Sequence, residues 1–244
     1  MQVIDLPNNT EHARYFASLP DGGPVYHEFH PEWIIVEPWN AISSLLILLP
    51  AVYWAFKLNK ELKNYLFLAY CMPLLFLGGL GSTLFHAFRN SEFFLWLDVF
   101  PTAVLTISLS IYFWIKVLPK WWQIFYIIVP AAGIRYGMYF IVSPHTALNI
   151  SYAITGTLLF LPILLLLNKI KYRYAGIIGA SIALFVLALV FRELDAWKEN
   201  ALPMGTHFLW HISTGVGAFY LAEFLYRFRR LENLKGEIYL ETAS

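Results

Sequence analysis

The sequence predicts an all-α integral membrane protein built as a bundle of seven transmembrane helices. Three observations lead to this fold class: the composition is apolar, the apolar residues form runs of membrane-spanning length, and basic residues collect in alternate connections between those runs. The 244 residues are 59% hydrophobic and only 14% charged, with a mean hydropathy of +0.57. Soluble domains are about one-quarter charged, so a water-soluble globule is not expected.

The charge balance limits the classes of partner. A formal net charge of +1 provides neither a basic field for nucleic acid nor an acidic field for cationic partners. The expected partners are therefore lipids or small amphiphiles. The single cysteine, Cys71, excludes an intramolecular disulfide and a metal cluster held by thiolates.

Seven apolar runs are long enough to cross the hydrocarbon core, which takes about 20 helical residues. They are Trp39 to Phe56, Tyr65 to Phe88, Phe93 to Ile115, Trp121 to Val142, Ala147 to Leu167, Tyr174 to Phe191 and Thr206 to Tyr226. Short connections between the runs predict one membrane domain over residues 37–228. An extramembrane N-terminal cap at residues 1–36 precedes it, and a tail at residues 229–244 follows it.

The basic residues predict the orientation, because lysine and arginine in short loops accumulate on the cytoplasmic side. One set of alternate connections holds Lys57, Lys60, Lys63, Lys116, Lys120, Lys169, Lys171, Arg173, Arg227, Arg229, Arg230 and Lys235. The opposite set holds only Arg14, Arg89, Arg192 and Lys198. The N-terminus is therefore expected outside, in a periplasm or an organelle lumen, and the C-terminus in the cytoplasm.

Five polar residues gather at the predicted outer end of the bundle. Ser82 and His86 end the second run, Asp98 begins the third, and His207 and His211 begin the seventh. A spacing of four places His207 and His211 on one helix face, which suits two ligands of one metal ion. A third histidine would complete a three-nitrogen set with an open fourth position, which is typical of catalytic zinc. Iron, copper and nickel also accept imidazole ligands.

Charge supports this grouping, because zinc with three neutral histidines keeps two positive charges that are costly near a low-dielectric medium. Asp98 would offset one of them. In the competing interpretation each histidine is an interfacial or packing residue, and Ser82 is a small residue that lets helices approach closely. Three imidazoles, a carboxylate and a hydroxyl at one membrane depth favour a functional site.

Three stretches around these residues form a set. They are Val36-Glu37-Pro38-Trp39-Asn40-Ala41-Ile42-Ser43, then Gly79-Leu80-Gly81-Ser82-Thr83-Leu84-Phe85-His86-Ala87 with Leu97-Asp98, and Gly205-Thr206-His207-Phe208-Leu209-Trp210-His211-Ile212. In these stretches the chain resembles the alkaline ceramidase family, within a superfamily of seven-helix membrane hydrolases that also includes the progestin and adipoQ receptors.

The resemblance implies a zinc amidase that cleaves the N-acyl bond of ceramide into a sphingoid base and a fatty acid. It implies that His86, His207 and His211 bind the zinc ion. Asp98 would orient or deprotonate the attacking water, and Ser82 would donate a hydrogen bond to the developing oxyanion. These roles agree with the general chemistry of metal-assisted hydrolysis.

The chain departs from the family in the N-terminal cap. Relatives have a calcium-binding acidic loop there, with a tryptophan-cysteine-glutamate run and a disulfide to the last lumenal loop. Here the corresponding residues 26–30 contain no cysteine, and Glu28 and Glu37 are the retained candidates for calcium ligands, with Asp21 and Glu32 nearby. Calcium takes six or more oxygen ligands, so we expect weaker calcium dependence than the resemblance suggests. In the competing interpretation Glu28 and Glu37 are solvated or interfacial charges.

Three other functions remain open from the sequence. The site could be the structural zinc site of an adipoQ-type receptor, the active site of a hydrolase for another lipid amide or ester, or incidental histidines of a transporter or scaffold. Asp98 favours an enzyme, because a purely structural site needs no carboxylate beside an open zinc position. The expected location is a bacterial inner membrane or a eukaryotic endoplasmic reticulum or Golgi membrane, with the site facing the periplasm or lumen.

Overall fold

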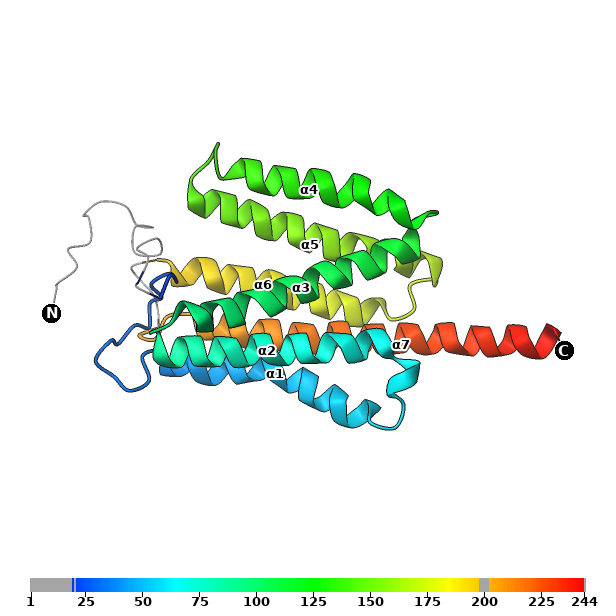
Figure 1. The fold of residues 1–244 in the computed structure, drawn as a ribbon, viewed down its shortest axis with the longest axis horizontal. Coiled ribbons are helices and arrows are strands. Elements are labelled where there is room, and N and C mark those ends of the chain that lie inside the picture. The colour runs from blue at the N-terminus through cyan, green and yellow to red at the C-terminus, as the bar shows by residue number, and fades with distance from the viewer. Residues whose placement is uncertain (1–18, 20, 198–201, 244) are drawn as a thin grey trace. The chain divides into compact units, whose positions relative to one another are not determined.

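The computed structural model describes residue 19 and residues 21–197 and 202–243. Arg14 and Lys198, two of the four basic residues counted on the predicted outer side, lie outside the described residues, as do all the other residues of 1–18. The described chain has no strand and contains seven α-helices with two short 3-10 helices (Figure 1). They are α1 (Pro38–Leu58), η2 (Leu62–Asn64), α2 (Leu66–Phe88), α3 (Glu92–Val117), η3 (Trp121–Ile124), α4 (Phe125–Met138), α5 (Pro144–Lys169), α6 (Ala175–Asp195) and α7 (His207–Ala243). The all-α prediction is confirmed.

Each predicted span corresponds to one helix, and five helices, α1, α2, α3, α5 and α6, are long and apolar enough to cross a membrane. The chain is therefore a membrane protein. With 14 residues, α4 extends about 21 Å at 1.5 Å per residue, which is less than the hydrocarbon core of about 30 Å. α7 is not among these five helices, and most of its charged residues follow Tyr226, beginning with Arg227, Arg229 and Arg230. The seventh helix continues to Ala243, beyond its predicted end at Tyr226. The number of crossings and the orientation stay predictions.

The chain divides into two compact units, one of residues 1–102 and 176–244 and the other of residues 103–175. In the first unit α1 packs along α2 and α7, and Figure 1 shows α1 beside α2. Glycines make these contacts close. A Cβ atom at Gly79 would lie 2.7 Å from the backbone nitrogen of Leu48, and one at Gly215 would overlap the carbonyl group of Leu46. Small residues of this kind bring membrane helices together backbone to backbone.

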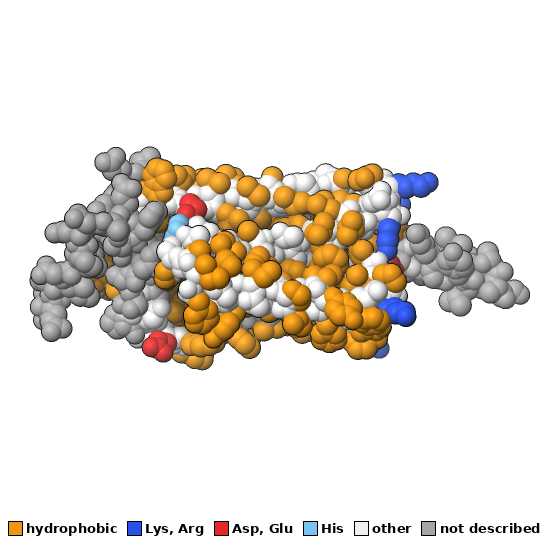
Figure 2. All heavy atoms as spheres, turned by 90° about the horizontal axis from the view of Figure 1, so that it is seen from above, with side chains coloured by type: hydrophobic (Ala, Val, Ile, Leu, Met, Phe, Trp, Pro, Cys, Tyr) orange, Lys and Arg blue, Asp and Glu red, His pale blue; other side chains and the backbone are white. Residues whose placement is uncertain are grey.

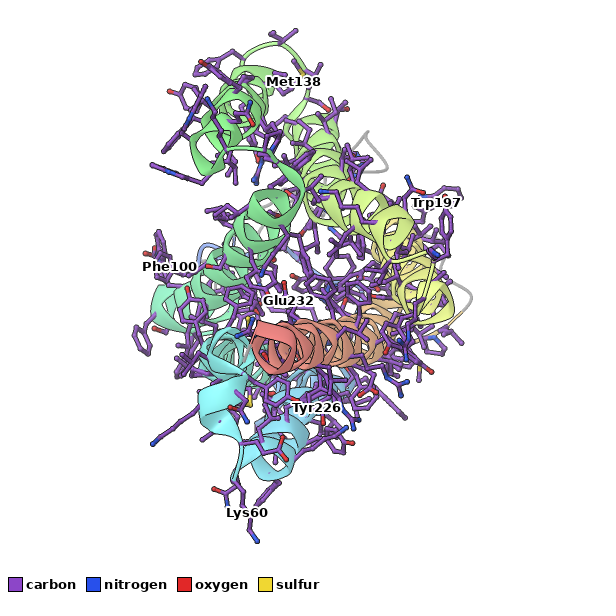
Figure 3. The ribbon with its side chains drawn as sticks, turned by 90° about the vertical axis from the view of Figure 1, so that its right-hand side faces the viewer. Lys60, Phe100, Met138, Trp197, Tyr226 and Glu232 are labelled. Carbon is purple, nitrogen blue, oxygen red and sulfur yellow. The ribbon has the colours of Figure 1, made fainter. Side chains whose placement is uncertain are left out.

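An aromatic cluster joins α1 to α7 at the predicted cytoplasmic end. The rings of Trp54 and Tyr226 have centroids 5.0 Å apart, and Lys57 Nζ lies 4.4 Å from the Trp54 centroid and 3.6 Å from a carboxylate oxygen of Glu223. Figure 3 shows Tyr226 of α7 on the side of the helix toward α1, whereas Lys60 points away from the helices. This cluster fixes one end of the helix pair, and the predicted site residues lie at the other.

A face of α1 exposes apolar side chains at intervals of three or four residues. These residues are Trp39, Ile42, Leu45, Leu49, Tyr53 and Phe56. This spacing places the six side chains on a single face of the helix. The face lies opposite the side of α1 that packs against other helices, and α1 is apolar enough to span a membrane. Hydrophobic side chains also cover much of the helical surface in Figure 2. We expect this face of α1 to contact lipid.

In the second unit, polar groups pair across the helices. Arg135 Nε, in α4, donates to Ser151 Oγ in α5 over 2.7 Å, and Trp114 Nε1, in α3, donates to the carbonyl of Leu158 over 2.9 Å. Polar groups at membrane depth need such partners, because lipid tails offer none. The second unit contains none of the residues that the sequence placed in the metal site.

Candidate metal centre

The three predicted ligand histidines meet in the first unit. His86 lies in the last turn of α2, and His207 and His211 lie in the first two turns of α7. One ring nitrogen from each residue lies within 4.8 Å of the others, and all three side chains are buried. The sequence prediction that these three residues converge is therefore confirmed, and the group could hold a metal ion.

Hydrogen bonds at the Nδ1 atoms prepare two of these imidazoles for metal binding. His86 Nδ1 lies 2.5 Å from Glu37 Oε2, and His211 Nδ1 lies 2.9 Å from Ser43 Oγ. The Ser43 hydroxyl donates to the carbonyl of Asn40 over 3.1 Å, so it accepts from His211. His211 Nδ1 therefore carries the proton and its Nε2 keeps its lone pair, and an ionised Glu37 would favour the same tautomer for His86.

His207 differs from the other two histidines. Its Nδ1 atom is buried and has no hydrogen-bond partner among the described residues. A buried nitrogen without a partner is costly, and a metal ion would satisfy it. The donor set of this cluster, three imidazoles with two of them already oriented, fits zinc.

The start of α1 is shaped by two glutamates with different partners. Glu28 accepts the backbone N–H groups of Trp39 and Asn40, each over 2.9 Å, and so caps the first turn of α1. Glu37, at the N-cap position, accepts no backbone N–H group of that turn; its Oε2 accepts from the Asn40 side chain over 3.3 Å and contacts His86. Its backbone N–H also donates to the carbonyl of His86 over 3.1 Å. The beginning of α1 is thereby held against the end of α2.

A buried cation lies next to this junction. Arg89 ends α2 in a left-handed conformation with φ 48°. Its guanidinium donates to Asp21 over 2.7 Å, to the carbonyl of Pro24 over 2.8 Å and to Glu37, and it lies 4.5 Å from the ring centroid of Phe85. Burial raises the pKa of Glu37 to about 8, although the Arg89 guanidinium opposes this rise. Arg89 therefore places a positive charge beside both buried acidic groups, Asp21 and Glu37, and favours their ionised forms.

The calcium candidates do not fit a calcium site. Glu28 and Glu37 are buried, so they are not the solvated charges of the competing interpretation. Both oxygen atoms of Glu28 accept backbone N–H groups, and both oxygen atoms of Glu37 accept from side chains. Asp21 binds Arg89, and Glu32 is exposed. A cation that requires six or more oxygen ligands would have to displace most of these bonds.

The carboxylate of Asp195, the last residue of α6, holds the beginning of α7. One oxygen accepts the backbone N–H groups of Thr206 over 2.7 Å and His207 over 2.9 Å, and the other accepts the N–H of His27 over 3.2 Å. Gly205 has φ +72°, and a Cβ atom there would overlap this carboxylate. Asp195 therefore caps α7 and ties the N-terminal cap to it. This capping role was not predicted from the sequence, in which Asp195 is an acidic residue after the sixth apolar run and Arg135 was considered as its partner; Arg135 instead donates to Ser151.

The predicted catalytic pair, Ser82 and Asp98, is also brought together. The buried Ser82 hydroxyl donates to the carboxylate of Asp98 on α3. Ser82 lies one helical turn before His86 on α2. A Cβ atom at Gly81 would overlap the backbone of Leu97 and Asp98, so glycine is what lets α3 approach here. The two interpretations of this stretch are compatible, since the glycine provides the close packing and the serine provides the hydrogen bond.

One ring from the N-terminal cap covers the histidines. The Tyr26 ring lies on that of His207, with centroids 4.0 Å apart and an interplanar angle of 32°, and its centroid is 5.0 Å from that of His86. Tyr26 was not predicted as a site residue, because an aromatic residue in an irregular segment carries no periodic signal in the sequence. Its position restricts access to the cluster from the cap.

Comparison with known proteins agrees with this geometry. Residues 27–241 match the family model described as Ceramidase. A search of curated proteins found no match. The matched range includes the three histidines, Ser82, Asp98 and both glutamates at the start of α1, and it covers most of the chain. The family predicted from the sequence motifs is confirmed, and the chain belongs to the Ceramidase family.

Proposed function

We propose that the protein is a zinc-dependent membrane amidase that hydrolyses the N-acyl bond of ceramide-like sphingolipids to a sphingoid base and a free fatty acid. Membership of the Ceramidase family implies a hydrolase. The observation that carries the proposal is the convergence of three buried imidazoles within 4.8 Å, with the ring nitrogens of two of them left free to bind a metal ion.

His86, His207 and His211 would hold the zinc ion. When bound, zinc polarises the carbonyl group of the scissile amide and activates water for attack. Glu37 and Ser43 hold the imidazoles of His86 and His211 in fixed orientations through their Nδ1 atoms. Such partners of ligand histidines tune metal affinity and geometry.

Asp98 would take the proton of the attacking water and deliver it to the departing amine. In the structure Ser82 donates its one hydroxyl proton to the Asp98 carboxylate. Once Asp98 carries the proton from water, it no longer needs that hydrogen bond. The Ser82 hydroxyl can then turn toward the substrate oxygen, where negative charge develops, and stabilise it.

The proposed substrate reaches the histidines from the bilayer. The site lies at one end of helices with exposed apolar faces, and Tyr26 covers it from the cap. A two-chain amide lipid would keep its chains among these helices while its amide group reaches the site. The orientation predicted from lysine and arginine would place that reaction in the outer leaflet.

The test combines metal analysis of the purified protein with mass spectrometry of products from a lipid panel. The panel holds ceramides, other lipid amides and lipid esters. We expect about one zinc ion per chain and release of sphingoid base and fatty acid from ceramide. His211→Ala should lose zinc and amidase activity together, because it removes one of three imidazoles.

The other outcomes separate the alternatives. Bound zinc without turnover of any lipid would favour a structural site of the receptor type. Preferential cleavage of esters or of other amides would correct the substrate class. Purified protein without metal, or full zinc occupancy in His211→Ala, would overturn the assignment of the site.

A further inference from the structure

The segment that precedes α1 exposes an apolar loop at the outer end. Trp33, Ile34 and Ile35 are 51%, 93% and 41% exposed, and they lie near the end of the N-terminal cap, shortly before the first residue of α1. No transmembrane run predicted from the sequence includes them. Single exposed apolar residues are ordinary, but a contiguous group of large ones marks an interaction surface.

Backbone hydrogen bonds fix the depth of this loop. Val36 N–H donates to the carbonyl of Ala87 over 2.9 Å, and Glu37 N–H donates to that of His86 over 3.1 Å. The C-terminal end of the loop is therefore held beside the last turn of α2, and α2 is apolar enough to cross a membrane. His30 N–H donates to the carbonyl of Val36 over 3.0 Å and closes the base of the loop. Its three apolar residues cannot extend far from the helix ends.

Exposed aromatic residues mark the membrane boundary at the same end of the first unit. Trp39 begins α1, and Phe93 and Trp96 begin α3, each with more than half of its surface exposed. Tryptophan prefers the interface between lipid and water. Trp33 stacks on the ring of His30, with centroids 4.0 Å apart and an interplanar angle of 15°. The interface is therefore expected at the level of the loop.

We propose that residues 33–35 form a membrane-inserted loop, in which Trp33 lies at the interface and the two isoleucines enter the outer leaflet. The partner is a lipid surface. The loop leads directly into the exposed apolar face of α1, which begins with Trp39 and Ile42, so one apolar surface is continuous from loop to helix. Three residues are too few for a stable protein interface, which buries about 1,200 Å² or more.

This insertion would attach the N-terminal cap at two points. Asp195 holds the cap to α7 through His27, and the loop holds it to the bilayer beside His86. If the proposed function holds, the loop would have a second effect. It would disturb lipid packing next to the histidines, where a ceramide must leave the bilayer to react.

Fluorescence quenching in proteoliposomes tests the insertion without any need for turnover. The single cysteine, Cys71, is buried and is replaced by alanine, and an environment-sensitive nitrobenzoxadiazole probe is attached to Ile34→Cys. Ile42→Cys on the lipid-facing side of α1 is the lipid reference, and Lys60→Cys at an exposed turn is the water reference. Nitroxide-labelled phosphatidylcholine quenches from the bilayer, and iodide, present on both faces of the vesicles, quenches from water.

We expect the probe at residue 34 to be quenched by the labelled lipid as at residue 42, and to be shielded several-fold from iodide relative to residue 60. Strong quenching by iodide with none by lipid would overturn the proposal. Shielding from both quenchers would also overturn it, because it would show that protein covers the loop.

The link to substrate access has its own test. Ile34→Asp should raise KM several-fold for ceramide in vesicles, with kcat unchanged, whereas the matched variant Ile34→Leu should behave as the wild type. A short-chain ceramide dispersed without vesicles should show no difference between the two variants. An unchanged KM for the vesicle substrate in Ile34→Asp would overturn the link to access. If no ceramide is cleaved by the wild type, the proposed function fails while the quenching result still decides the insertion.

Discussion

Replacement of Asp195 is expected to release the start of α7 and the N-terminal cap together. Its buried carboxylate accepts three backbone N–H groups, from Thr206, His207 and His27. A hydrogen bond to a charged group contributes about 1.5–3 kcal/mol, and a helix N-cap contributes about 1 kcal/mol. Asp195→Ala removes all three bonds, and water can satisfy some of the released donors. The expected loss of unfolding free energy is about 4 kcal/mol.

Asp195→Asn separates the two connections. The amide oxygen can still accept the N–H groups of Thr206 and His207, but the amide NH2 group would face the N–H of His27. This variant should keep the α7 cap and lose the connection to the N-terminal cap, at a cost of about 1–2 kcal/mol. Zinc affinity should fall about tenfold or more in Asp195→Ala, because the first turn that carries His207 loosens. In Asp195→Asn it should change little.

Hydrogen exchange measured by mass spectrometry, with zinc affinity from chelator competition, checks this prediction. Asp195→Ala should raise exchange in peptides covering residues 24–30 and 205–212, and Asp195→Asn only in the former. Glu32→Gln is the control, because this exposed residue of the N-terminal cap lies 4.0 Å from the partly exposed His30 and such surface pairs contribute about 0–1 kcal/mol. Unchanged protection of both peptides in Asp195→Ala would refute the assigned role.

Further changes probe the rest of the site. Gly81→Ala should push the α3 backbone away and lower turnover about tenfold or more with zinc retained, whereas Gly179→Ala, where a Cβ atom meets nothing within 4 Å, should leave turnover unchanged. Asp98→Asn should keep zinc and lower turnover about 10²-fold or more, and Ser82→Ala should cost roughly 3 kcal/mol of transition-state stabilisation. Near-normal turnover in Asp98→Asn would move the assignment toward a structural zinc site. Calcium chelation should change neither turnover nor thermal stability, because Arg89 already pairs with Asp21 and Glu37. Arg89→Leu should lower the free energy of unfolding by about 3–5 kcal/mol. A complete, reversible loss of turnover on calcium chelation with zinc retained would contradict this.

The helices were predictable because an apolar run long enough to cross a membrane has few other stable structures. The ends of the helices were less predictable. The sixth apolar run was predicted to stop at Phe191, whereas α6 continues to Asp195. The convergence of the histidines was predictable for a related reason. The spacing of His207 and His211 sets one helix face, and the membrane depth inferred for His86 places it at the same end.

The partners of the site residues were not predictable, because hydrogen bonds between distant segments leave no periodic pattern in a sequence. Glu37 was a candidate calcium ligand and proves to bind His86 and Arg89. Arg89 counted as one of four basic residues on the outer side, yet it is a buried cation. Asp195 is recognisable only once the segments around His27 and His207 are folded against α6.

Removal of the metal should loosen the site locally and leave the helix packing intact. His86 and His211 have protein partners at Nδ1, so both imidazoles stay oriented without a ligand at Nε2. His207 Nδ1 has no such partner among the described residues, so the metal is what would hold this ring. The contacts of α1 with α2 and α7 depend on glycine packing and on the cluster around Trp54, at the other end of these helices.

A zinc chelator should therefore raise hydrogen exchange around residues 206–210 first, while peptides from residues 41–56 stay protected. The midpoint of thermal unfolding should still fall, because a ligand bound only to the native state adds its binding free energy to stability. If chelation instead exposed α1 at the same rate as the start of α7, the metal would be holding the first unit together, and the hydrogen bonds from Glu37 and Ser43 would not be sufficient to orient the site.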